Sequence, residues 1–170
     1  VGPRQAELES ALKVSAEFEA HLRSLGDIPK EVHVTWPSTA ILNSSAEMAV
    51  LGVQRLVRLN PDWTVHVYDD SALDAFLEQS PTLRNLGADP ALLAGAHVVE
   101  KTDAFRLLVL LERGGLYLDA DRLVTEQLRE VLRHDTRLVL PTYYDVNFCQ
   151  DLFASPPANR MLERLGREQW

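Results

Sequence analysis

Two aspartates one residue apart, directly after an apolar stretch, are the part of this sequence best suited to chemistry. Residues 116–121 read Leu-Tyr-Leu-Asp-Ala-Asp, which predicts a β-strand whose side chains alternate between two faces. The alternation places Tyr117, Asp119 and Asp121 on one face and three apolar side chains on the other. We therefore expect the two acids at the carboxyl end of the strand, where open α/β sheets bind ligands.

Two ionised carboxylates at this spacing lie about 6.5–7 Å apart along a strand. At an effective dielectric constant of ~20 they repel each other by roughly 2–3 kcal/mol. A divalent cation that prefers oxygen ligands, Mn²⁺ or Mg²⁺, would offset this cost, so Asp119 and Asp121 are candidate metal ligands. The alternative is a solvated strand end whose aspartates begin a turn, because an Asp-x-Asp motif alone is a weak signal.

A second pair of charges precedes this strand. Asp103 and Arg106 lie one helical turn apart near the start of a helix that is otherwise rich in Ala, Phe, Leu and Val. Charges on a mostly buried helix are costly unless they are paired or used. One interpretation is a local salt bridge worth about 0.3–0.5 kcal/mol; the other is that Asp103 accepts from ligand hydroxyls while Arg106 donates to oxygens near a phosphate. Because Gly114 and Gly115 lead directly into the strand, we expect both pairs of charges to face one cleft.

The remaining elements must position these residues, and their order indicates the fold class. Strands that alternate with helices predict an α/β fold with a mainly parallel sheet. The patterns predict six helices: 8–25, 43–59 with a cap at 43–45, 69–77 opened by 69–71, 91–113, 126–133 and 158–165. They predict five strands: 31–35, 64–68, 116–121, 137–140 and 147–154.

Composition excludes several classes of protein. The 17 Lys and Arg against 25 Asp and Glu give a net charge of −8, which argues against binding to nucleic acid, since that requires clustered basic residues. No apolar run approaches the roughly 18–20 residues of a membrane span, and the single Cys149 cannot form an internal disulfide. Because the sequence begins with Val, we expect a piece of a longer protein, with membrane association only through segments outside it.

Three motifs in order resemble one enzyme family. They are Lys-x-Asp-x-x-Arg with Gly-Gly-x-Tyr-x-Asp-x-Asp over residues 101–121, Ile-Pro-Lys-Glu-Val-His-Val-Thr-Trp over 28–36, and Asn-Pro-Asp-Trp-Thr-Val-His-Val-Tyr-Asp-Asp over 60–70. Together they resemble the sugar-binding region of DXD-containing glycosyltransferases, closest to glycosyltransferase family 32, which includes inositol-phosphoceramide mannosyltransferases. The resemblance covers roughly residues 28–160.

The resemblance implies a GT-A fold of the nucleotide-diphospho-sugar transferases, incomplete at its carboxyl end, over residues 28–170, preceded by an N-terminal helix over 1–27. It also implies a metal-dependent enzyme, with Mn²⁺ (or Mg²⁺), that transfers a hexose with retention of configuration. The donor would be a nucleotide-sugar, with GDP-mannose favoured and a UDP-hexose as the other choice, and the acceptor a glycan or glycolipid hydroxyl. The implied location is the Golgi lumen if the source is eukaryotic and the cytoplasm if it is bacterial.

The same resemblance assigns roles to four catalytic residues by position. Asp121 should bind the metal directly, and Asp119 should support the ribose or sugar and the shell of the metal. Asp103 and Arg106 should hold the donor sugar.

Two aromatic residues complete the implied donor site. Tyr117 should lie beside the donor sugar and Trp36 near the base, where an indole face suits stacking; without the resemblance, Trp36 is a core aromatic at a strand end. Nearby, we expect His33 to be a hydrogen-bonded structural histidine and Asp70 to cap the following helix.

Two departures and two alternatives remain. Leu107 stands where the family usually has Tyr, and nothing matches the family's downstream Gly-Pro segment with its late His or Trp. A phosphohydrolase of the haloacid-dehalogenase type also has an apolar strand ending in Asp-x-Asp, in which Asp119 would be the nucleophile. A module that binds nucleotide-sugar without turnover is the other alternative.

Overall fold

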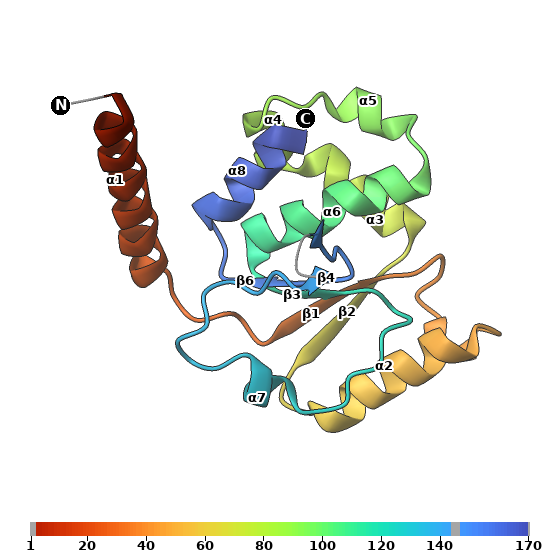
Figure 1. Ribbon diagram of the computed structural model, residues 1–170. Helices are drawn as coiled ribbons and strands as arrows, with labels where there is room; N and C mark the ends of the chain where they lie inside the picture. The colour runs from red at the N-terminus through yellow and green to blue at the C-terminus, as the bar shows by residue number, and fades with distance from the viewer. Residues whose placement is uncertain (1–2, 144–146, 170) are drawn as a thin grey trace.

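In the computed structural model, which describes residues 3–143 and 147–169, a four-stranded sheet lies between two layers of helices (Figure 1). The strands follow the order β2-β1-β3-β6. β1 pairs in parallel with both β2 and β3, while β6 joins the edge of β3 antiparallel. The predicted α/β fold with a mainly parallel sheet is confirmed. The strands are β1 (Glu31–Thr35), β2 (Thr64–Tyr68), β3 (Gly115–Leu118) and β6 (Leu152–Ser155).

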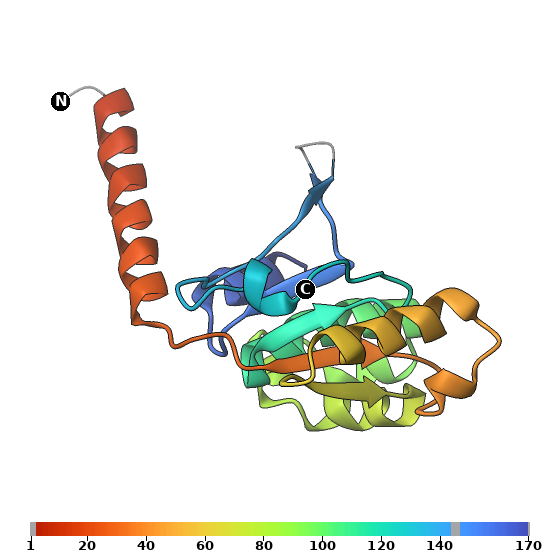
Figure 2. The same ribbon diagram turned by 90° about the horizontal axis from the view of Figure 1, so that it is seen from below.

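The helices lie on opposite sides of the sheet. α6, α3, α4, α5 and α8 are above it in Figure 1, and α2 and α7 are below it. A small antiparallel pair, β4 (Thr142–Tyr143) with β5 (Asn147–Phe148), projects away from the sheet (Figure 2). The helices are α1 (Pro3–Ser24), α2 (Glu47–Leu59), α3 (Asp70–Gln79), α4 (Pro81–Asn85), α5 (Pro90–Ala94), α6 (Val98–Arg113), α7 (Leu128–Val131) and α8 (Arg160–Gln169), with a 3-10 turn η1 (Ile41–Asn43) before α2.

The side-chain alternation along β3 divides the core into two clusters. Tyr117 enters the upper cluster with Phe105 and Leu108 of α6, whereas Leu116 and Leu118 enter the lower cluster, which faces α2. All of these side chains are buried. The prediction that Leu116 and Leu118 enter a core was correct, but Tyr117 on the opposite face is covered as well, because α6 packs over it.

Two of the predicted helices begin elsewhere. The pattern over residues 91–113 predicts one helix, but the chain forms α5 and α6 with a break at residues 95–97. His97 begins α6 as its N-cap and forms a capping box with Glu100, so local capping chemistry ends the apparent periodicity. The expected cap at residues 43–45 was also wrong: α2 begins after Ala46, whose side chain makes no capping hydrogen bond.

The carboxyl-terminal half contains less regular structure than the pattern predicts. The helix over 126–133 is only the single turn of α7, and residues 137–140 form one isolated bridge, between Val139 and Ala154. The strand over 147–154 is divided between β5 and β6. Asp70 is the first residue of α3 rather than its cap, because the side chain of Asp69 accepts from Ala72 N.

Helix α1 stands apart from the layers in Figure 1. It is tied to the rest of the chain near its end, where Arg160 N donates to His21 Nε2 and Arg137 pairs with Asp27 across 3.4 Å. The division of the chain at residue 27 stays a prediction.

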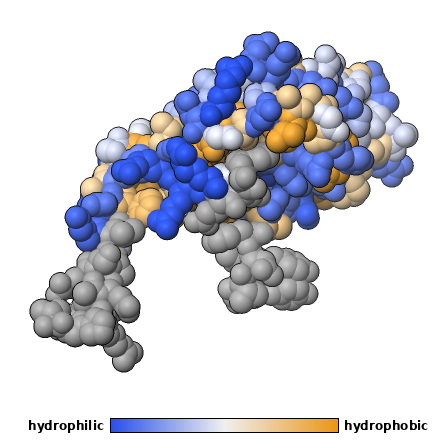
Figure 3. Space-filling view, turned by 90° about the horizontal axis from the view of Figure 1, so that it is seen from above, coloured by the Kyte–Doolittle hydropathy of each residue, from blue (hydrophilic) through white to orange (hydrophobic). Residues whose placement is uncertain are grey.

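Within the described ranges, no helix has the length and apolar character needed to cross a bilayer. The face seen in Figure 3 is mostly hydrophilic with small hydrophobic patches.

The buried His33 joins β1 to the turn that precedes β3. Its Nε2 lies 2.9 Å from Gly114 O, and its Nδ1 lies 3.1 Å from Tyr68 Oη. A carbonyl can only accept, so Nε2 carries the proton and Nδ1 accepts from the tyrosine. Gly114 and Gly115 have φ values of 71° and 101°, which other residues rarely adopt, so this entry into β3 requires glycine. His33 is therefore a structural histidine, as expected.

Burial of His33 should make the stability of the fold depend on pH. Burial lowers the pKa of His33 from 6.5 to about 4, so the unfolded chain binds more protons between these values. The free energy of unfolding should therefore fall as pH drops from 6.5 to 4, by about 3 kcal/mol from this group. Urea unfolding at pH 7 and pH 4.5 measures the loss. In His33→Gln, which keeps a donor for Gly114 O but does not titrate, this part of the loss should be absent; an unchanged pH dependence would contradict it.

Candidate active site

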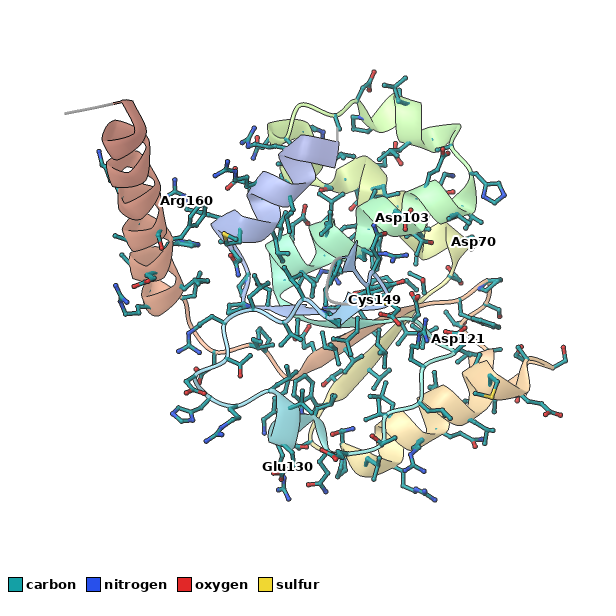
Figure 4. The ribbon with its side chains drawn as sticks, viewed as in Figure 1. Asp70, Asp103, Asp121, Glu130, Cys149 and Arg160 are labelled. Carbon is teal, nitrogen blue, oxygen red and sulfur yellow. The ribbon has the colours of Figure 1, made fainter. Side chains whose placement is uncertain are left out.

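A hollow of about 690 Å³ lies at the carboxyl ends of β1 and β3. Its wall is made by Thr35 and Trp36 at the end of β1, by residues 45–49 at the start of α2, and by residues 119–121. The volume lies within the roughly 300–1,000 Å³ typical of small-molecule sites. The structure thus brings three of the predicted site residues, Trp36, Asp119 and Asp121, to one hollow, and Asp121 is labelled at this end of the sheet in Figure 4.

Asp119 is held at both its backbone and its side chain. β3 ends at Leu118, and Asp119 N donates to Asp151 O across 2.9 Å. The Tyr117 hydroxyl donates to Asp119 Oδ1 across 2.8 Å. The predicted shared face of Tyr117 and Asp119 is therefore observed. Asp121 reaches the hollow differently, because Arg122 N donates to Asp119 O and the chain turns after the strand.

The surroundings of Asp119 disfavour its charge. Burial raises the pKa of the Asp119 carboxyl above its usual value, and the nearby charges of Asp121 and Asp151 raise it further. The Tyr117 hydrogen bond and the Arg106 guanidinium act in the opposite direction. A cation placed between Asp119 and Asp121 would favour the ionised form, so this part of the chain is electrostatically suited to bind one.

Two residues that no sequence motif indicated lie beside the acids. Asp151, just before β6, has a side chain only 18% exposed, and Arg122 Nε contacts its Oδ2 across 2.7 Å. The same Nε lies 4.0 Å from Asp121 Oδ1. Arg122 therefore balances part of the negative charge of the site. In the sequence, Arg122 could be linked to the site because it follows Asp121 directly. Asp151 could not be linked to it, because it lies thirty residues after Asp121.

Asp103 and Arg106 do not share this hollow. Asp103 lines a separate hollow of about 510 Å³ with residues of the α4–α6 region. Arg106 is only 8% exposed: its Nη2 contacts Asp103 Oδ1 across 2.8 Å, and its Nη1 donates to Gln150 O. The expected single cleft is thus divided, because the local salt bridge and the carbonyl hold Arg106 inside the protein.

The buried Arg106 still acts on Asp119, because its guanidinium favours the ionised carboxylate. Its guanidinium lies 5.1 Å from the centre of the Tyr117 ring, a cation–π distance. Its Nε has no hydrogen-bond partner within the described part of the chain. Tyr117 itself has no exposed surface, so its ring is not open to direct contact with a ligand. Trp36 is partly exposed and lines the hollow, and its backbone N donates to Tyr68 O at the end of β2.

Helix α2 fixes the segment that follows the two acids at three successive points. At Gly52, a Cβ would lie 2.4 Å from Ala120 O and 2.9 Å from Arg122 O, so the backbones touch. One turn later, Arg55 Nε donates to Val124 O across 2.6 Å. Beyond the helix end, the buried Asn60 accepts from the backbone N of Leu128.

The side chains of the hollow supply suitable oxygen ligands for a hard divalent cation, but only part of the set that such a cation needs. The two carboxylates are the oxygen ligands that Mn²⁺ and Mg²⁺ prefer. Among the described residues, no group of three or more His, Cys, Asp or Glu side chains could enclose a metal ion. Asp119 and Asp121 would therefore hold the cation together with oxygens of a ligand, as Mg²⁺ sites with phosphates commonly do.

The mainly parallel sheet, the hollow at the carboxyl ends of β1 and β3 and the two acids beside it define an α/β protein with a ligand-type site at the edge of its sheet. Residues 46–138 match the family described as glycosyltransferase sugar-binding region containing DXD motif. The match covers more than half of the chain, and the protein belongs to this family.

Two relatives place the chain further. It is 30% identical over 99 residues to mannosyl phosphorylinositol ceramide synthase CSH1 of Saccharomyces cerevisiae, a match that covers 55% of this chain and 23% of the yeast protein. Its fold is similar to that of the PaToxG glycosyltransferase, with a TM-score of 0.59 and 18% identity over 93% of this chain and 66% of that chain. The chain thus spans about a quarter of the length of the yeast relative and about two thirds of the PaToxG chain.

Proposed function

We propose that the protein is a metal-dependent glycosyltransferase that moves a hexose from a nucleotide-sugar to a hydroxyl of a glycan or glycolipid with retention of configuration. The observation that carries the proposal is the hollow that joins Asp119, Asp121 and Trp36 in a chain of the DXD family. Mannose from GDP-mannose is the favoured donor sugar, since the yeast relative is by its name a synthase of a mannosyl lipid.

The residues of the hollow divide the work of binding the donor. Trp36 stacks against the base, and Asp119 and Asp121 would hold a divalent cation together with oxygens of the donor. The cation, when bound, neutralises the negative charge that develops on the departing diphosphate. Arg122, already paired with Asp151 beside Asp121, contributes a further positive charge at this end of the site.

Asp103 and Arg106 act from outside the hollow of the two acids. Asp103 is the more exposed member of the pair, with 41% of its side chain accessible, and from its own hollow it accepts from hydroxyls of a donor sugar that extends beyond the hollow of the two acids. Arg106 stays inside, orients Asp103 and holds Gln150 O. Membrane association, where it occurs, comes through segments outside this chain.

The two alternatives differ from this proposal in measurable ways. A phosphohydrolase would form a covalent phosphate on Asp119, but the Asp119 Oδ1 oxygen already accepts from Tyr117 and the family match favours sugar transfer. A non-catalytic module would bind the nucleotide-sugar and leave it intact.

A panel of donors tests the function. We expect the purified protein to hydrolyse or transfer sugar from GDP-mannose faster than from UDP-glucose or UDP-galactose, with Mn²⁺ required and activity lost in excess chelator. Binding of GDP with Mn²⁺, measured by calorimetry, separates binding from turnover. Binding without turnover would favour the non-catalytic module, and turnover that is indifferent to the chelator would contradict the metal-dependent mechanism.

A further inference from the structure

The fully buried Tyr117 has a hydroxyl that connects two separate segments at the rim of the hollow. It donates to Asp119 Oδ1 across 2.8 Å and lies 3.2 Å from Thr35 Oγ1. Its ring is fixed in the upper core, with the Phe105 ring edge-on at 6.5 Å and the Arg106 guanidinium 5.1 Å from its centre. The hydroxyl is therefore the only part of Tyr117 that reaches the site, and a rigid core sets its position.

The direction of the hydrogen bonds follows from the chemistry of the acceptor. An ionised carboxylate can only accept, so the Tyr117 proton points to Asp119. The tyrosine oxygen is then left to accept, and Thr35 donates to it. The hydrogen bonds thus run one way, from Thr35 through Tyr117 to Asp119, and donation by Thr35 polarises the tyrosine hydroxyl and strengthens its bond to the acid.

The two acids of the motif differ in how firmly the protein holds their side chains. Asp119 is fixed by the tyrosine hydroxyl at its side chain and by Asp151 O at its backbone. Asp121 has a side chain that is 65% exposed, and its nearest cation is Arg122 at 4.0 Å. One acid is thus held in place before any ligand arrives, and its second oxygen, Oδ2, remains for the ligand.

We propose that Thr35 and Tyr117 are positioning residues that hold the Asp119 carboxylate ready for the cation and diphosphate of the donor, with Thr35 acting through the Tyr117 hydroxyl. The proposal rests on the proposed function of the hollow. It differs from a direct role for Tyr117 at the sugar, because the ring has no exposed surface.

A set of conservative variants tests the proposal with Mn²⁺ plus GDP as the probe and calorimetry as the readout. Tyr117→Phe should weaken binding about 5- to 10-fold, which corresponds to the net contribution of one ordinary hydrogen bond. Thr35→Val should weaken it about 2- to 3-fold, and Thr35→Ser, which restores a hydroxyl, should recover most of that loss. Because Thr35 acts through Tyr117, the double variant should bind no more weakly than Tyr117→Phe alone.

Tyr68→Phe is the matched control for the loss of a tyrosine hydroxyl. Tyr68 is half-buried, and its hydroxyl bonds to His33 and Arg113 rather than to Asp119. We expect this variant to lose stability in urea to a similar extent as Tyr117→Phe while keeping wild-type binding. Equal binding losses in both tyrosine variants would assign the effect to the fold and overturn the proposal.

The remaining outcomes distinguish a failure of this proposal from a failure of the proposed glycosyltransferase function. Multiplied losses in the double variant would mean that Thr35 contacts the ligand directly, which overturns its positioning role. Wild-type affinity in Tyr117→Phe would overturn the proposal while leaving the glycosyltransferase function intact. No binding of GDP or UDP with Mn²⁺ to the wild-type protein would overturn both.

Discussion

Exchanging Asp121 for asparagine should lower turnover of the nucleotide-sugar by roughly 10²–10³-fold. The side chain keeps its size but loses the charge that would hold a cation next to the diphosphate. Because 65% of the Asp121 side chain is exposed and its nearest cation is 4.0 Å away, the free energy of unfolding should change little. Donor hydrolysis at saturating Mn²⁺ measures the first effect, and urea unfolding measures the second.

The control for this variant removes an equal charge elsewhere. Asp135 is exposed in a turn between α7 and β4, so Asp135→Asn changes the net charge of the chain by the same amount without touching the hollow. It should retain wild-type turnover. Full activity in Asp121→Asn, or an equal loss in both variants, would show that Asp121 has no specific role in metal binding.

Adding one methyl group at Gly52 should damage both stability and donor binding. Alanine favours a helix interior over glycine by about 1 kcal/mol, but here the new Cβ would meet two backbone oxygens, Ala120 O at 2.4 Å and Arg122 O at 2.9 Å. Backbone atoms cannot turn aside as a flexible side chain would. We therefore expect Gly52→Ala to lower the free energy of unfolding by about 1–3 kcal/mol and to weaken binding of Mn²⁺ with GDP, as the segment that carries Asp121 is pushed away.

Gly95→Ala provides the comparison for Gly52→Ala. Gly95 has no atom within 4 Å of its hypothetical Cβ and an ordinary φ of −90°, so the substitution should be neutral or slightly stabilising. Urea unfolding and calorimetry on both variants separate the contact from a general effect of removing glycine. If Gly52→Ala is as stable as the wild type and binds as well, α2 does not restrain the acids.

Local patterns were sufficient to predict the central strands. The alternation in β1 and β2 and the glycine pair at the start of β3 predicted these elements, and the side-chain period correctly placed Leu116 and Leu118 in a core. The same period could not show that Tyr117 is buried. Alternation tells which residues share a face, whereas burial depends on what packs against that face, and here α6 covers it.

The composition of the site was only partly predictable for the same reason. Asp119 and Asp121 stood out because only one residue separates them in the sequence and they follow an apolar strand. Asp151 and Thr35 did not, because each meets the acids through tertiary contacts across 30 residues or more. The sequence indicated correctly that Arg106 is costly to bury without a partner. It did not show that Asp103 and the carbonyl of Gln150 would be its partners, and these contacts hold the side chain inside the protein and away from the hollow.

The three contacts along α2 have a consequence for how this family can vary. Gly52, Arg55 and Asn60 meet the chain at residues 120–122, 124 and 128, so the two segments run side by side in a fixed register. Inserting or deleting one residue between Asp121 and Leu128 would leave at least one of these anchors without its counterpart. The length of this connection is therefore constrained by geometry rather than by chemistry, and size changes that evolution tolerates should fall after Leu128 instead.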